Sequence, residues 1–97
     1  MSSDASLDRA LHAIADPTRR RILQVLKEGK NSEIRPGFLC GGDVEERIRL
    51  SQPTISHHMG ILTKAGLVEA TKQGQWRWYR RDEKAIRQVV KSLRGKL

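Results

Sequence analysis

The chain has 97 residues, the length of one small domain, which we place at residues 1–97. Nineteen basic and eleven acidic residues give a formal net charge of +8, which points to a polyanionic partner such as nucleic acid, while a basic surface that only maintains solubility is the alternative. A single cysteine, Cys40, excludes an intrachain disulfide, no apolar run approaches the roughly 20 residues of a membrane span, and no signal-peptide pattern opens the chain. We therefore expect a cytoplasmic protein with no membrane partner.

Residues 7–29 predict two helices. The first is amphipathic and ends near Ala15. The second begins with Asp16 as N-cap and Pro17 at the first helical position, and Gly29 ends it. The apolar residues at helical spacing are Leu7, Leu11 and Ile14 in the first helix and Ile22, Leu23, Val25 and Leu26 in the second.

Residues 30–38 contain Asn, Ser, Pro and Gly and predict a loop, which Gly41 and Gly42 extend. The sequence leaves open whether this loop is a sensor or a spacer. Asp43 is then expected to cap a short third helix. The apolar residues of that helix are Val44, Ile48 and Leu50.

Ser51 is a good N-cap for a fourth helix, because its hydroxyl can accept a hydrogen bond from a free amide of the first turn, and Gly66 ends that helix. Ile55, Met59 and Leu62 recur at helical spacing and should face a core. The other face carries short or planar hydrogen-bonding side chains, which can read base edges or hold phosphates. These candidate readers are Gln52, Thr54, Ser56 and His57.

Adjacent histidines follow within this helix, and successive helical residues lie about 100° apart. His57 and His58 therefore cannot both face one metal ion. We expect His57 to face the nucleic acid and His58 to pack at the edge of the helix pair.

Residues 67–72 and 76–81 alternate apolar and polar side chains around a turn at 73–75, which predicts a β-hairpin. Residues 82–96 predict a last helix, with an apolar face of Ile86, Val89, Val90 and Leu93. Two short helices joined by a tight turn and followed by a hairpin make a winged helix-turn-helix. The fold class is therefore mainly α, with about five helices and a two-stranded hairpin as the wing.

The wing and the flanking helices add basic and polar side chains that can reach phosphates or the minor groove. Trp76, Trp78 and Tyr79 fit stacking on bases or a structural role, and a period of two puts the two tryptophans on one face and the tyrosine on the other. The expected nucleic-acid contacts outside the first turns of the fourth helix are Lys72, Gln75, Arg77, Lys64 and Arg20.

Several motifs stand in a specific order along the chain. They are residues 15–19 (ADPTR), 21–23 (RIL), 50–59 (LSQPTISHHM), Leu62, 65–68 (AGLV) and, more loosely, 74–79 (GQWRWY). With these motifs the sequence resembles the ArsR/SmtB family of bacterial winged-helix repressors. The resemblance implies a homodimer that binds operator DNA, releases it when an effector binds, and dimerises through its first and last helices.

The resemblance also implies metal ligands that this chain lacks. Many members carry Cys-x-Cys-Asp at the third helix, where this sequence has Cys40 and Asp43 but Gly42 in place of the second cysteine. One thiolate cannot close a tetrahedral site, and residues 82–97 contain no histidine for the second metal site of the family. We expect no metal site and no cofactor.

Cys40 and the nature of the polyanion leave alternatives open. A cysteine between a loop and a helix start can have a lowered pKa, so a redox- or thiol-reactive repressor is one alternative, against an inert cysteine. A winged-helix RNA-binding protein is another.

Gly60 stands where relatives often have lysine, and glycine at this position weakens the helix by about 1 kcal/mol. No spacing of nucleophile and base predicts an enzyme.

Overall fold

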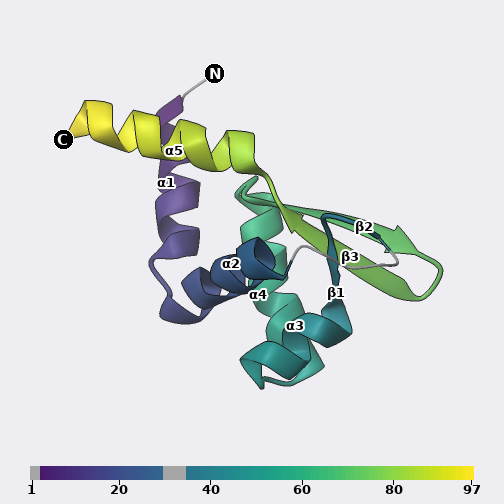
Figure 1. The fold of residues 1–97 in the computed structure, drawn as a ribbon. Helices are drawn as coiled ribbons and strands as arrows, with labels where there is room; N and C mark the ends of the chain where they lie inside the picture. Colours follow the sequence, from purple (N-terminus) through teal and green to yellow (C-terminus); the bar gives the residue numbers. More distant parts are fainter. Residues whose placement is uncertain (1–2, 30–34) are drawn as a thin grey trace.

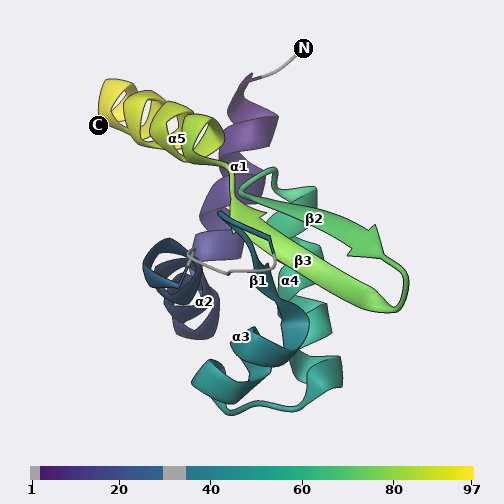
Figure 2. The same cartoon turned by 45° about the vertical axis from the view of Figure 1, so that its right-hand side comes forward.

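The computed structural model describes residues 3–29 and 35–97 of the chain, and within them it confirms the winged helix-turn-helix (Figure 1). The elements are α1 (Ser3–Ile14), α2 (Pro17–Glu28), β1 (Leu39–Cys40), α3 (Gly41–Ile48), α4 (Gln52–Lys64), β2 (Val68–Gln73), β3 (Trp76–Arg81) and α5 (Glu83–Lys96). Helices α2, α3 and α4 pack together, and the β2–β3 hairpin projects from them to one side (Figures 1 and 2). Helix α5 lies against α1, at the end of the molecule opposite to α3.

The start of α2 is capped as the sequence predicts. The Asp16 carboxylate accepts a hydrogen bond from the backbone amide of Arg19 at 2.9 Å, and Pro17 occupies the first turn. The same amide hydrogen bond, with the Arg19 charge nearby, holds the pKa of Asp16 below its ordinary value. Gly29 is the C-cap of this helix, also as predicted.

The third helix begins earlier and ends earlier than predicted. It starts at Gly41 with Cys40 at the N-cap position, so Asp43 lies inside the first turn and does not cap it. The reason is strand β1, which carries the chain in an extended conformation directly to Gly41. At the other end Arg49 adopts a left-handed conformation with φ 63°, which ends the helix and leaves Leu50 in the turn, 37% exposed.

Helix α4 ends at the predicted glycine through a Schellman motif. Gly66 has φ 79°, a conformation that glycine adopts without steric cost. Its amide donates to the Thr63 carbonyl at 3.0 Å, and the Leu67 amide donates to the Leu62 carbonyl at 3.1 Å. The chain therefore turns sharply from α4 into β2.

The wing is part of a three-stranded antiparallel sheet in the order β1-β3-β2, and not a two-stranded hairpin as predicted. The third strand was missed because β1 has only two residues. Strand β3 is thus central, and both of its faces are covered: Tyr79, paired with Leu39, is 4% exposed, and Trp78, paired with Cys40, is 6% exposed. The hairpin turn contains two residues, since Gln73 still pairs with Trp76.

The loop between α2 and β1 returns to the outer face of this sheet. The Phe38 ring lies between the guanidinium groups of Arg35 and Arg80, each 4.8 Å from its centroid. Arg35 also donates to the Gln73 side-chain oxygen at 2.9 Å. The described end of the loop therefore braces the wing, while the predicted loop residues 30–34 lie outside the described residues.

One hydrophobic core joins the helices to the sheet. Its fully buried large side chains are Ile22, Val44, Met59 and Leu62, which the sequence periodicity predicted. Helix α5 differs from α2 and α4, because none of its residues is buried. Across residues 3–29 and 35–97, no helix combines the length and the apolar character needed to cross a membrane.

Candidate nucleic-acid interface

Helix α4 has the apolar back and polar front that the sequence predicts. Ile55, Met59 and Leu62 are buried, and the opposite side is open to solvent. At about 100° per residue, that open side runs along the whole helix. That side consists of Pro53, Thr54, His57, Gly60 and Lys64, while Ser56 is half-buried at its edge and Gln52 and Thr63 are exposed beside the buried face.

The N-terminus of α4 is arranged differently from the prediction. Ser51 has the extended backbone of an N-cap, but its hydroxyl makes no hydrogen bond to a helix amide and instead lies 3.0 Å from the Thr54 hydroxyl. Thr54 points about 160° around the helix from Ser56, so these two predicted readers do not share a face. The first turn contains no acidic residue, so the positive end of the helix dipole is available to a phosphate.

A groove of about 240 Å³ separates the start of α4 from the wing. Four of the predicted contacts line it together: Gln52 and Ser56 from α4, and Gln75 and Arg77 from the wing. The groove also includes Glu45, Trp76, Gly41, Gly42, Ile55 and Tyr79. Hence two elements far apart in the sequence present polar side chains to one concave surface.

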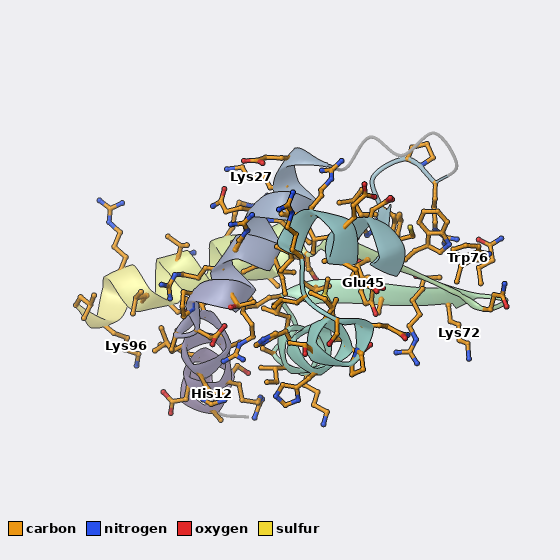
Figure 3. The ribbon with its side chains drawn as sticks, turned by 90° about the horizontal axis from the view of Figure 1, so that it is seen from below. His12, Lys27, Glu45, Lys72, Trp76 and Lys96 are labelled. Carbon is orange, nitrogen blue, oxygen red and sulfur yellow. The ribbon has the colours of Figure 1, made fainter. Side chains whose placement is uncertain are left out.

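Sequence reasoning missed Glu45 as part of this groove, because a single acidic residue in a helix carries no signal of its own. Glu45 is half-buried on α3 and lies below that helix, toward the groove (Figure 3). A carboxylate there can accept a hydrogen bond from the exocyclic amine of cytosine. It also adds one negative charge to the lining of the groove, to which Arg77 contributes a positive one.

The two sides of the wing differ in chemistry. Lys72 and Arg77 are paired across β2 and β3, both are exposed, and Lys72 extends away from the side that carries Trp76 (Figure 3). Trp76 is 57% exposed, whereas Trp78 is 6% exposed. The structural role weighed for the aromatic residues therefore holds for Trp78 and Tyr79, and Trp76 is a surface residue of the wing.

The other five predicted contacts, which do not line the groove, are Thr54, His57, Lys64, Lys72 and Arg20. Lys64 is the last residue of α4, about 18 Å along the helix axis from Gln52, and borders a hollow with Asp8 and His12 of α1. Arg20 is exposed, and its guanidinium donates to the Ile14 carbonyl at 2.7 Å, at the end of α1. His57, by contrast, is exposed on the open side of α4.

A buried arginine holds α4 against the first two helices, which the run of three arginines did not predict. Arg19 is 8% exposed and donates through Nε to the Ala13 carbonyl at 2.6 Å and through Nη2 to the His12 carbonyl at 3.3 Å. Its Nη1 lies 3.2 Å from Nδ1 of His58, which is half-buried between the helices as predicted. These contacts orient α4 through a side chain that faces inward.

The residues at the family's metal position do not fit a metal ion. The Cys40 thiol donates to the Asp43 carboxylate at 3.2 Å. A Cβ at Gly42 would lie 3.9 Å from the sulfur, but glycine has no side chain that could supply a second metal ligand there. In the described part of the chain no three His, Cys, Asp or Glu residues come together as a metal-binding group. Burial raises the pKa of the Cys40 thiol, contrary to the lowering weighed from its place beside a helix start.

The groove is bounded by a helix-turn-helix and a basic hairpin, which defines the class of winged helix-turn-helix proteins. Residues 16–70 match the family model described as bacterial regulatory protein, arsR family. This match covers more than half of the chain, and the protein therefore belongs to the arsR family of bacterial regulatory proteins.

Individual relatives agree with this assignment. The helix-turn-helix transcriptional regulator MJ1325 of Methanocaldococcus jannaschii is 38% identical over 79 residues, 81% of each chain. The transcriptional repressor SdpR of Bacillus subtilis is 37% identical over 73 residues, 75% of this chain and 72% of SdpR. The solution structure of a homodimeric winged helix-turn-helix DNA-binding domain from Mycobacterium bovis superimposes with a TM-score of 0.72 at 22% identity, covering 95% of this chain and 79% of the other.

Proposed function

We propose that the protein is a transcriptional repressor that binds operator DNA as a homodimer, with residues 1–97 acting as one DNA-binding domain. The observation that carries the proposal is the groove between α4 and the wing, which joins Gln52, Ser56, Gln75 and Arg77 on one exposed surface. The relative SdpR is named a transcriptional repressor, which supports repression rather than activation for this protein. A protein that binds operator DNA in this way would act in the cytoplasm, and no feature of the proposal requires an enzymatic activity.

In the proposed complex, the open side of α4 enters a major groove of the duplex. Gln52 suits a bidentate contact with adenine, and Ser56 and His57 suit base edges or phosphates. Lys72 and Arg77 of the wing hold the backbone or the adjacent minor groove, and Lys64 extends the backbone contact at the other end of α4. The contacts to phosphates position the protein, and those to bases select the sequence.

The dimer is proposed from the apolar surface left on α5 and from the homodimeric Mycobacterium bovis domain. Val90 is 60% exposed, and Ile86, Val89 and Leu93 are only partly buried against α1 and the core. A second copy that covers these side chains would place two α4 helices on half-sites one helical turn of DNA apart.

The test begins with genomic fragments that the purified protein retains, whose shared sequence supplies the operator. The double variant Ser56→Ala with His57→Ala should weaken binding to that operator by at least tenfold, because each lost base contact costs about 1–3 kcal/mol. Its mass by light scattering should stay at twice the 11.0 kDa of one chain. Gln24→Ala, an exposed change on α2, serves as the matched control and should leave affinity unchanged.

Three results would contradict the proposal. The double variant could bind the operator as tightly as the unchanged protein, which would remove α4 as the reader. The protein could sediment as a monomer at micromolar concentration. It could also bind single-stranded or hairpin RNA as tightly as the operator duplex, which would favour the RNA-binding alternative.

A further inference from the structure

Helix α5 carries a concentration of positive charge that the proposed operator interface does not use. It contains five basic residues and one acidic residue, a net charge of +4, which is half of the formal net charge of +8. Helix α4, which faces the operator in the proposed complex, contains a single charged residue, Lys64. The strongest cationic element of the protein is thus not the helix proposed to read DNA.

The cations of α5 form one stripe. At about 100° per residue they fall within an arc of about 80°, and at 1.5 Å per residue they extend about 15 Å along the axis. All four are exposed, and no ion pair among the described residues involves them. The stripe consists of Lys84, Arg87, Lys91 and Arg94.

Helix electrostatics favours Arg94, in the last turn, but does not explain the other three cations of the stripe. Lys84 and Arg87 lie in the first two turns, where the positive end of the helix dipole disfavours cations. The successive members are three or four residues apart, so each repels its neighbour and destabilises the helix. An anionic partner that lies along the helix would relieve this repulsion.

The stripe faces away from the body of the protein. Ala85 and Val89 line the hollow between α5 and the end of α4, about 140–180° around the helix from the centre of the stripe. Of the apolar side chains proposed for the dimer, Ile86, Val89 and Leu93 lie about 120–180° from the centre of the stripe, whereas Val90 lies about 80° from it, beside Arg94. A partner subunit centred on Val89 and Leu93 therefore leaves the stripe open. Figures 1 and 2 place α5 at the end of the molecule opposite to α3, which adjoins the start of α4.

From this arrangement we propose that the basic stripe of α5 binds the phosphate backbone of a second DNA duplex, without sequence preference, so that one dimer bridges two DNA segments. This inference rests on the proposed operator-binding function. The stripe suits a duplex because it offers a straight row of cations and no aromatic side chain on which unpaired bases could stack. It does not suit a membrane surface, because an interfacial helix inserts its apolar side chains into the membrane, whereas Ile86 and Val89 of α5 pack against the core of the protein.

The bridging test immobilises the operator duplex on beads, loads the unchanged protein, and measures capture of a fluorescent duplex of scrambled sequence at low salt. A quadruple variant replaces the four cations of the stripe by glutamine: Lys84→Gln, Arg87→Gln, Lys91→Gln and Arg94→Gln. Its operator affinity should stay within about threefold of that of the unchanged protein, but it should capture at least about tenfold less of the scrambled duplex. Glutamine retains helix propensity, so circular dichroism and the dimer mass should not change. The matched control exchanges lysine and arginine at the same four positions and should capture the duplex normally.

Different failures have different meanings. Equal capture by the quadruple variant, or no capture by the unchanged protein, overturns the bridging inference and leaves operator binding intact. A parallel loss of operator affinity and capture overturns it as well, because the stripe would then belong to the operator interface. Capture of RNA or polyglutamate in preference to the duplex assigns the stripe to another partner. Failure of the unchanged protein to hold the operator refutes the proposed function itself, and the bridging inference with it.

Discussion

Helices α4 and α5 have nearly the same length, 13 and 14 residues, but they meet their surroundings in opposite ways. Helix α4 buries Ile55, Met59 and Leu62 within its own subunit and exposes a nearly neutral face of small polar residues. Helix α5 buries no residue, leaves Val90 exposed, and carries a strongly cationic face. The difference indicates that the apolar side of α4 is covered by its own fold, whereas α5 leaves both apolar and cationic surface available to other molecules.

A matched pair of leucine truncations tests this difference most strongly. Leu62→Ala should lower the free energy of unfolding by about 2–5 kcal/mol, because Leu62 is fully buried and its removal leaves a cavity in the core. Leu93→Ala on α5 should lower it by less and should instead weaken dimer association, since Leu93 is only partly buried within one subunit. Urea unfolding at two protein concentrations, with sedimentation to measure the dimer, separates these effects. Equal losses of unfolding free energy from both truncations would show that the two helices do not differ in this way.

A pair of glycine substitutions sharpens the comparison at the exposed faces. Gly60→Ala should raise the free energy of unfolding by about 1 kcal/mol, because nothing lies within 4 Å of the added Cβ and glycine weakens a helix interior. The same change should weaken operator binding several-fold, because the new methyl group lies on the open side of α4 that approaches DNA. Gly95→Ala on α5 also meets nothing within 4 Å and should stabilise without any effect on operator affinity. Thermal unfolding and gel-shift titration measure the two quantities, and tighter operator binding by Gly60→Ala would count against close approach at this residue.

The smallest effects concern Cys40, the N-cap residue of α3. Burial, the first cause, raises its pKa from the ordinary 9.0, so at neutral pH the thiol stays protonated and should react with iodoacetamide more slowly than free cysteine. Because the pKa is higher in the folded state, the associated stability is complete below pH 9.0 and is lost as the pH rises through the folded value. Asp43→Asn removes the neighbouring negative charge and should speed alkylation slightly. Fast alkylation of the unchanged protein at neutral pH would revive the thiol-reactive alternative.

Local patterns in the sequence were sufficient for most of the fold. The Asp16 cap, the buried positions of α4 and the Gly66 stop depend on interactions within a few residues, and all three are confirmed. The start of α3 was wrong because it depends on the pairing of Cys40 with Trp78, 38 positions further along the chain. The same long-range pairing buries both Trp78 and Tyr79, which a two-stranded wing could not do.

The candidate site divides in the same way. The residue types at the start of α4 follow from the sequence, and their roles as DNA contacts stay predictions. The groove that joins Gln52 and Ser56 to Arg77, and the inclusion of Glu45 in it, required the three-dimensional packing of α3, α4 and the sheet. Arg19 shows the limit most clearly: three consecutive arginines have equal charge in the sequence, but only the tertiary structure turns one of them inward, onto the carbonyls of α1 and the ring of His58.

The amino-acid sequence by itself therefore determined the order of the elements, the apolar faces and the positive charge of the protein, because periodicity, capping and composition act over short stretches of chain. Tertiary structure alone decided the third strand, the shared groove and the outward direction of the basic stripe on α5. These features depend on which distant segments come into contact, and spacing along the chain does not encode such contacts in a form that can be read residue by residue.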